Sequence, residues 1–404
     1  MDLSRPEPGP ADARAWLRLG AVAAGLLAVA SDAAALWGDQ LEVFLAETVT
    51  SDSNVFRRSS AEERDTHTTT TAGFNFDIPV SRQRFQAGAS WNQVRYNRLS
   101  DLNYLGHDGK AIWLWQFGDQ LSGHLGYTET AALASFDNFG DRLANPLRTR
   151  RAYGDAAYML TPSWELQAGL ANQTQRNGNA IRQVNDVDRQ NADLTINYVS
   201  PASNKIGLSL RQEDGDYPNR QLIGATLYEN DYVQRSIGAV TDWTITGKSH
   251  LNARVDRVRR SFDQLSQRDY NGTTFRAVYD WRATGKLALR AIARKEISNT
   301  EDIQTSFVLV KGIALRPTFD VSEKIRLAAI ADYSIRDYLG DPELALGTTT
   351  IRTNHVRRIG ATVSYRPMRS LTLQLTGQHE TRSSNVPLND YTDNILSLNA
   401  RFAF

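Results

Sequence analysis

The chain ends in Leu398-Asn399-Ala400-Arg401-Phe402-Ala403-Phe404, which alternates apolar and small or polar side chains up to the carboxylate. Leu398, Phe402 and Phe404 recur with period two, the period at which successive side chains of a β-strand return to the same face. This stretch therefore predicts a terminal β-strand with one strongly apolar face.

The same alternation runs through the rest of the chain. Trp164, Leu166, Ala168 and Leu170 alternate with polar or small residues, as do Leu371, Leu373 and Leu375. Such period-two patterns predict half-buried strands. We predict an all-β fold of about 18 strands, with 16 as the alternative. The expected strands lie near 40–49, 67–77, 84–97, 108–117, 120–130, 148–160, 163–176, 188–200, 204–213, 229–244, 249–261, 269–282, 286–297, 303–316, 323–338, 351–366, 370–382 and 391–404.

Two kinds of connection alternate between these strands. Short turns such as 161–163 and 284–286 carry the Pro and Gly residues that set tight turns. Longer polar connections include 131–147 and 214–229. Short turns at one end and long loops at the other are the pattern of antiparallel outer-membrane barrels. A soluble sandwich or propeller is the other all-β possibility, but the chain shows no blade-like repeat.

The N-terminal region reads as a secretory signal peptide spanning residues 1–35. Arg14 and Arg18 precede or open an apolar run that ends at Ala30, and Ala33-Ala34-Ala35 supplies a small-x-small cleavage pattern. A membrane anchor is the alternative, but the run is short for crossing hydrocarbon. Residues 36–404 are then expected to form the barrel.

Composition supports an exported barrel. The 404 residues include no Cys, and mean hydropathy is −0.45, which excludes a helical inner-membrane protein. The 46 basic and 45 acidic residues give a net charge of +1, so a nucleic-acid partner is not expected. Eight Trp, 15 Tyr and 14 Phe are sufficient for aromatic girdles at two membrane interfaces.

With these features in place, the last strand resembles the C-terminal signal of bacterial outer-membrane β-barrels, in which a terminal Phe is typical. The resemblance implies an outer-membrane location reached through a cleaved signal peptide. It also implies outer-membrane lipid and the barrel assembly machinery as partners, with Leu398, Phe402 and Phe404 as the assembly signal.

Strand parity places a set of arginines on the face opposite the apolar side chains. Lipid-facing arginines are costly in a barrel, so these side chains are expected to point into the lumen. The predicted transport-lumen residues are Arg211, Arg254, Arg276, Arg290, Arg294, Arg326 and Arg358. They form either a solvated wall neutralised by acids such as Asp280 and Asp332, or a basic stripe that favours an anionic or polar chain.

The third long connection, 131–147, is a candidate constriction loop. It contains Phe136, Asp137, Phe139 and Asp141. A loop of this length can fold inward and narrow a pore, or it can remain an ordinary surface loop.

No catalytic or metal-binding motif is apparent. The six His are scattered without metal-ligand spacing, and there is no phosphate-binding loop or nucleophile elbow, so neither a cofactor nor an enzyme activity is predicted. A barrel enzyme is kept as an alternative because His355 and His379 are expected near Asp390 and Asp393 at the outer rim.

Several turn and rim segments resemble the EpsL family of outer-membrane barrels, which are encoded with exopolysaccharide synthesis genes in bacteria carrying exosortase and PEP-CTERM systems. The segments are Asp216-Tyr-Pro-Asn-Arg220, Asp242-Trp with Thr246-Gly-Lys-Ser249, Leu265-Ser-Gln-Arg-Asp269, Tyr279-Asp-Trp with Thr284-Gly-Lys-Leu287, and Tyr338-Leu-Gly-Asp-Pro342. The resemblance extends from Thr50 to Phe404 and brings no catalytic residues.

The resemblance implies a role in carrying exopolysaccharide across the outer membrane. The expected partners are then the exopolysaccharide chain and periplasmic polysaccharide export proteins. A general diffusion porin for small solutes is the first alternative, and a barrel enzyme that modifies polysaccharide or lipid is the second.

Overall fold

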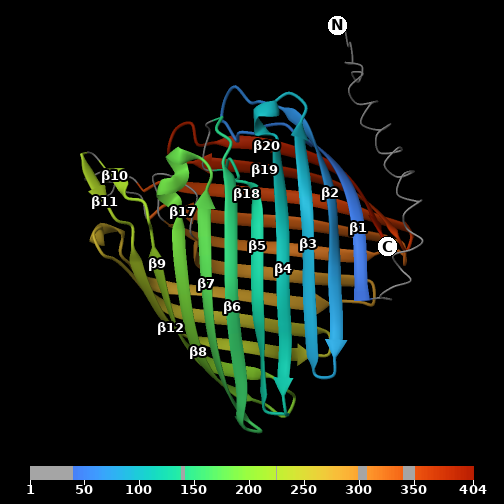
Figure 1. The fold of residues 1–404 in the computed structure, drawn as a ribbon, viewed down its shortest axis with the longest axis vertical. Coiled ribbons are helices and arrows are strands. Elements are labelled where there is room, and N and C mark those ends of the chain that lie inside the picture. The colour runs from blue at the N-terminus through green and yellow to red at the C-terminus, as the bar shows by residue number, and fades with distance from the viewer. Residues whose placement is uncertain (1–39, 138–141, 224, 299–306, 340–350) are drawn as a thin grey trace.

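The computed structural model describes residues 40–137, 142–223, 225–298, 307–339 and 351–404. One antiparallel 18-stranded sheet closes on itself, and Figure 1 shows β1 to β9 in front of strands that cross steeply behind them. Its strands are β1 (Leu41–Asp52), β2 (Asp65–Val80), β3 (Gln83–Tyr96), β4 (Tyr104–Phe117), β5 (Leu121–Leu133), β6 (Pro146–Thr161), β7 (Trp164–Asn177), β8 (Val187–Val199), β9 (Lys205–Asp216), β12 (Tyr232–Thr246), β13 (Ser249–Phe262), β14 (Tyr270–Arg282), β15 (Leu287–Ser298), β16 (Val308–Asp320), β17 (Ile325–Asp337), β18 (Thr353–Met368), β19 (Leu371–Ser384) and β20 (Tyr391–Ala403).

Small elements decorate the long connections. They are the hairpin β10 (Gln221–Ile223) and β11 (Thr226–Tyr228), and the short 3-10 helices η2 (Ser100–Leu102), η3 (Ala180–Asn185) and η4 (Ser266–Arg268). Among the residues the structure describes, no helix is long and apolar enough to cross a membrane.

The barrel closes where the first strand pairs with the last. Leu45 of β1 lies opposite Phe402 of β20, and the amide of Phe404 donates a 2.8 Å hydrogen bond to the carbonyl oxygen of Val43. On the far side, β9 pairs directly with β12 and bypasses the β10–β11 hairpin. Each strand of the sheet thus has two neighbours, which removes the exposed edges that hydrocarbon does not tolerate.

The two faces of the sheet differ sharply. In the paired strands β12 and β13, Ile237 and Val255 are 56% and 51% exposed, whereas the intervening Ser236 and Asp256 are 9% and 7% exposed. Side chains alternate between the two faces along each strand, and residues directly opposite each other on paired strands share a face. The same difference between the faces therefore continues around the barrel. The exposed apolar side chains form the outward face, and the polar side chains line the lumen.

Aromatic residues gather on the outward face beside the short turns. They are Phe85, Trp113, Trp115, Phe117, Tyr158, Trp164, Tyr198, Trp243, Trp281, Phe319, Tyr365, Phe402 and Phe404. Such a ring is typical of the interface between hydrocarbon and headgroups. It identifies the short-turn end as one membrane boundary.

The tight turns at this end use residues with left-handed backbone conformation. Gly118 has a φ of 62°, and Ser81 and Ser203 have φ values of 56° and 61°. Glycine adopts this conformation without steric cost, whereas serine is strained there. The turns therefore depend on local sequence as well as on the flanking ladders.

The predicted all-β barrel of 18 strands is confirmed, and the alternative count of 16 is wrong. One connection differs from the prediction, because 214–229 contains the β10–β11 hairpin, in which Leu222 lies opposite Leu227. The predicted start of a strand near 303 lies outside the described residues, and β16 is described from Val308. The predicted signal peptide, residues 1–35, lies outside the described residues and stays a prediction.

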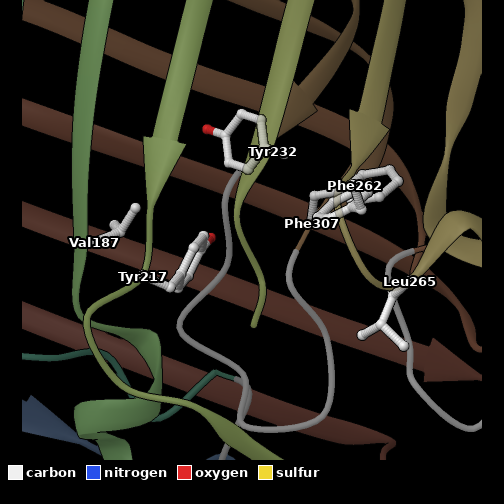
Figure 2. Close-up of a cluster of buried hydrophobic side chains, with 6 residues drawn as sticks. All are labelled: Val187, Tyr217, Tyr232, Phe262, Leu265 and Phe307. Carbon is white, nitrogen blue, oxygen red and sulfur yellow. The ribbon is translucent and has the colours of Figure 1, made fainter. Parts of the chain in front are cut away.

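The long connections pack into two apolar clusters at the other end of the barrel. The first rim cluster joins three connections through Val55, Phe56, Leu99, Leu102 and Phe136. The second rim cluster consists of Val187, Tyr217, Tyr232, Phe262, Leu265 and Phe307, and Figure 2 shows its side chains gathering from the ends of separate strands. These clusters hold the connections over the barrel mouth.

Candidate channel lumen and constriction

All seven predicted lumen arginines lie on the lumen face of their strands. Register and alternation place Arg254 on the same face as Asp256, for example, and opposite to the exposed Val255. Five of the arginines occupy the middle of their strands. Arg290 and Arg326 instead lie near the short-turn ends of β15 and β17. The arginines therefore form two levels rather than one continuous stripe.

Six of the seven arginines are paired with an acid. The pairs are Arg254–Asp256 at 2.6 Å, Arg276–Glu296 at 3.0 Å, Arg290–Asp280 at 2.7 Å, Arg294–Asp332 at 3.4 Å, Arg326–Asp320 at 2.5 Å, and Arg358–Glu380. Arg211 lies opposite Asp193 in the β8–β9 register. The wall thus alternates positive and negative groups, and most of its basic charge is compensated. Whether these residues act in transport stays a prediction.

The β5–β6 connection reaches across the barrel mouth. Its Asp137 Oδ1 lies 3.8 Å from Nε of Arg57, which belongs to the β1–β2 connection. The carbonyl oxygen of Asp137 also accepts a hydrogen bond from the guanidinium of Arg382 on β19. Because β4, β3, β2, β1 and β20 separate β5 from β19, the loop must extend inward to make this contact.

Arg57 is the hub of the network beneath this loop. Its guanidinium lies 3.1 Å from Asp52 and 3.2 Å from Asp393. Burial disfavours the charged guanidinium, but the carboxylates of Asp52, Asp393 and Asp137 outweigh that effect and raise the pKa of Arg57 above its ordinary value. The charge of Arg57 is therefore permanent, and the loop is held by a fixed cation.

Arg382 links the loop to the lumen wall. Its guanidinium stacks on the ring of Tyr391 at 4.4 Å and donates a 2.5 Å hydrogen bond to the carbonyl oxygen of Asn389. The hydroxyl of Tyr391 in turn donates to Glu380, which is the partner of Arg358. Asp137 and the lumen arginine Arg358 thus belong to one connected polar network.

The predicted constriction residues have different environments. Phe136 is only 8% exposed and packs edge-to-face on Phe56, with ring centroids 4.9 Å apart, so it anchors the loop and does not line the opening. Asp137 is the member that reaches the lumen network. Phe139 and Asp141 lie outside the described residues.

A second polar link lies within the second rim cluster. The guanidinium of Arg260 sits 3.9 Å from the ring centroid of Tyr232 and 5.2 Å from that of Phe307. The hydroxyl of Tyr232 donates a 2.6 Å hydrogen bond to Glu213, and Arg260 lies 3.4 Å from the same carboxylate. This desolvated cation between aromatic rings fixes the connections on the opposite part of the rim.

Sequence reasoning missed Arg57, Arg382, Tyr391 and Arg260. Parity could have placed Arg382 and Arg260 on the lumen face beside the predicted arginines. Arg57 had no such signal, because it lies in a connection without periodicity. Its role depends on contacts with residues far away in the chain.

The residues of the predicted assembly signal share the outward face. Phe402 and Phe404 pack edge-to-face with centroids 4.8 Å apart, and Leu398 lies on the same side. Their place on the strand agrees with the spacing in the sequence. Their role in assembly stays a prediction.

The histidines proposed for a barrel enzyme do not pair with the rim aspartates. His379 Nδ1 lies 2.8 Å from the amide oxygen of Asn394 on the outward face, whereas Asp393 points to the lumen and pairs with Arg57. His355 Nδ1 lies 2.8 Å from the hydroxyl of Tyr333. Within the described ranges, no three His, Asp or Glu side chains cluster so as to hold a metal ion.

Comparison with known proteins places these features in context. Residues 252–404 match a family model described as "Putative beta-barrel porin 2". No curated protein matches the chain. The EpsL resemblance gains no support from these matches and stays a prediction.

Similar solved structures are outer-membrane proteins. They include OpdK of Pseudomonas aeruginosa, with 10% identity over 91% of this chain and 99% of that one, at a TM-score of 0.49. OccK2 (OpdF) of Pseudomonas aeruginosa has 11% identity over 90% of this chain and 98% of that one, at a TM-score of 0.48. A BenF-like porin of Pseudomonas fluorescens Pf-5 has 11% identity over 91% of this chain and 99% of that one, also at a TM-score of 0.48. At such identities the likeness concerns the fold alone.

The closed 18-stranded sheet, its apolar outward face and its polar lumen define the class. The chain is a porin-like β-barrel of the outer-membrane type.

Proposed function

We propose that the chain is a passive channel of the porin type for small polar solutes. The observation that carries this proposal is the inward reach of the β5–β6 connection, whose Asp137 contacts Arg57 and Arg382. A loop held across a barrel narrows the water-filled passage, and passage diameter is a main determinant of which solutes cross.

The charged lumen wall supports a weakly selective passage. Paired groups such as Arg290 and Asp280 offer both a donor and an acceptor to a passing solute, while their charges largely cancel. Many weak sites of this kind favour entry without trapping the solute. Sugars and other hydrated, uncharged or zwitterionic solutes fit this wall.

Swelling of liposomes that contain the purified barrel tests the proposal. The rate of swelling in isosmotic sugars should fall steadily from monosaccharides to tetrasaccharides. Folding is checked independently by the change in gel migration on boiling. If a correctly folded barrel admits no monosaccharide, the channel proposal is wrong.

Export of an exopolysaccharide is the second candidate, supported by the turn segments that resemble EpsL barrels, such as 216–220 and 265–269. It requires the β5–β6 connection to leave the mouth, since a polymer needs a wider passage than a small solute. Periplasmic polysaccharide export proteins would then be partners. Deleting the gene should abolish surface polymer and leave polymer in the periplasm. Unchanged surface polymer would remove this candidate without affecting the porin proposal.

A further inference from the structure

Charged side chains on the outward face are concentrated in the outer part of the barrel. Apart from Glu47 of β1, outward positions of the described strands between the short turns and this zone hold apolar, small or uncharged residues, as at Leu287, Leu289, Ala291 and Ala293 of β15. The first outward charge on that strand is Lys295, close to its outer end. The charged zone therefore lies where the apolar band ends, at the level of lipid headgroups.

Several charges in this zone are paired with each other. Arg176 lies 2.6 Å from Asp188, and Lys311 lies 2.8 Å from Asp337. Arg150 lies 3.4 Å from Glu129. Such pairs need no external partner.

Exposed outward arginines without an ion pair among the described residues include Arg95 on β3 and Arg357 on β18. Three more lie together on the paired strands β12 and β13. Arg235 and Arg259 lie directly opposite each other in the strand register, and Arg257 is the next outward residue on β13. All three are exposed, and no carboxylate of a described residue lies within ion-pair distance of them. Nε of Arg235 donates a 3.2 Å hydrogen bond to the neutral side-chain oxygen of Gln212, and the amide nitrogen of Gln212 donates in turn to the carboxylate of Asp214.

This arrangement is unfavourable without an anion. Like charges directly opposite each other destabilise a strand pair, and three guanidinium groups at a membrane boundary reinforce that repulsion. Guanidinium groups bind phosphate oxygens through paired N–H donors. A ligand with one or two phosphate groups would therefore convert the repulsion into attraction.

An apolar hollow begins at the same arginines. The hollow has a volume of 2210 Å³ and is open to the surroundings of the barrel. Its lining passes from Arg235, Arg257 and Arg259, with Asp214 beside them, to outward apolar side chains such as Ile237 and Leu210. From there it extends along the outward wall as far as β2. A ligand that fits both parts has an anionic head and hydrocarbon chains.

We propose that Arg235, Arg257 and Arg259 bind the phosphate groups of a phosphorylated lipid of the outer leaflet, whose acyl chains occupy the adjoining hollow. A soluble phosphate would satisfy the arginines but would leave the hollow unfilled, and the outward face of the barrel is in contact with lipid. The site is separate from the lumen and from any solute that passes through it.

Native mass spectrometry of the detergent-solubilised barrel tests this site. The probes are bis-phosphorylated lipid A and the same lipid with both phosphates removed. The wild-type chain should retain the phosphorylated lipid at several-fold higher occupancy. An Arg257→Gln, Arg259→Gln variant should lose that preference. An Arg148→Gln, Arg150→Gln variant, changed at a similar depth on the same face, should keep it.

Two further measurements make the result decisive. An Arg257→Lys, Arg259→Lys variant retains the charge without the planar fork and should bind with intermediate occupancy. Added inorganic phosphate should displace little of the lipid, because it lacks acyl chains. Three results would each overturn the proposal. They are equal occupancy of the phosphorylated lipid on the wild-type chain and the Arg257→Gln, Arg259→Gln variant, equal binding of the phosphorylated and dephosphorylated lipids by the wild-type chain, and complete displacement of the lipid by inorganic phosphate.

Discussion

Arg382 on β19 donates a hydrogen bond to the carbonyl oxygen of Asp137, across a barrel in which five strands separate β19 from β5. The donor is held by its stacking on Tyr391, and the acceptor belongs to a connection anchored by Phe136. The contact therefore joins a loop to the lumen wall at a defined place.

Replacing Arg382 by Gln should loosen this loop. The variant loses the hydrogen bond to Asp137 and the stacking on Tyr391, so Asp137 keeps its contact with Arg57 but loses its link to β19. We expect larger and noisier single-channel conductance in planar bilayers. The change in gel migration on boiling, which reports folding, should be the same as for the wild-type barrel.

Arg82→Gln is the matched control for Arg382→Gln. Arg82 pairs with Asp119 at 2.7 Å in a short turn, away from the long connections. Its loss should leave conductance unchanged. If the wild-type, Arg382→Gln and Arg82→Gln barrels give identical single-channel conductance traces, the Arg382 contact does not limit the passage.

Reversing Arg290, Arg294 and Arg326 to Glu should shift ion selectivity toward cations. Each reversal places a second carboxylate beside an existing one, as at Asp280 and Asp332. The barrel should still fold, because its ladders remain paired and the lumen is wet. The reversal potential in a salt gradient measures the change.

The control for this triple reversal carries the same change of net charge in the short turns. Lys248, Lys286 and Lys324 changed to Glu should move the reversal potential much less. If the lumen variant keeps the wild-type value, the arginines contribute only to the pore wall.

Deleting Phe404 should reduce assembly several-fold. Phe404 stacks on Phe402 on the outward face, and its amide donates to Val43 at the closing seam of the barrel. The amount of heat-modifiable barrel in the outer membrane measures the effect. Ala403→Ser, on the opposite face, should assemble normally. An undiminished yield without Phe404 would rule out its role in the assembly signal.

Replacing Phe307 by Ala should weaken the second rim cluster. Phe307 is 0% exposed and stacks on Phe262 with centroids 5.9 Å apart. Truncating a buried Phe costs roughly 3–5 kcal/mol, because contacts are lost and a cavity remains. Limited proteolysis should then cut the outer connections while the barrel core stays protected. Wild-type protease resistance would contradict this role.

The barrel itself could be predicted from local sequence, because period-two alternation and turn residues are local properties. β7 and β19 show this most clearly, as their apolar residues alternate without interruption. The lumen face of the arginines followed from the same parity. The hairpin β10–β11 was missed because three-residue strands carry too short a pattern to recognise.

The contacts of the candidate site could not be predicted in this way. Arg294 pairs with Asp332 two strands away, while its register partner on β16 is Gly312. Such a pair depends on side-chain reach across a sheared sheet. The contact of Asp137 with Arg382 depends on the closure of the whole barrel, which no local pattern encodes.

The central claim is that Asp137 lies in the conducting passage. The chain has no Cys, so an Asp137→Cys variant carries one thiol for a bulky charged thiol reagent. An Ile181→Cys variant provides a control on the exposed surface of η3, where Ile181 is 57% exposed. We predict that the reagent reduces single-channel conductance of the Asp137→Cys barrel in planar bilayers and leaves the Ile181→Cys barrel unchanged. Full labelling of Asp137→Cys without loss of conductance would contradict the account.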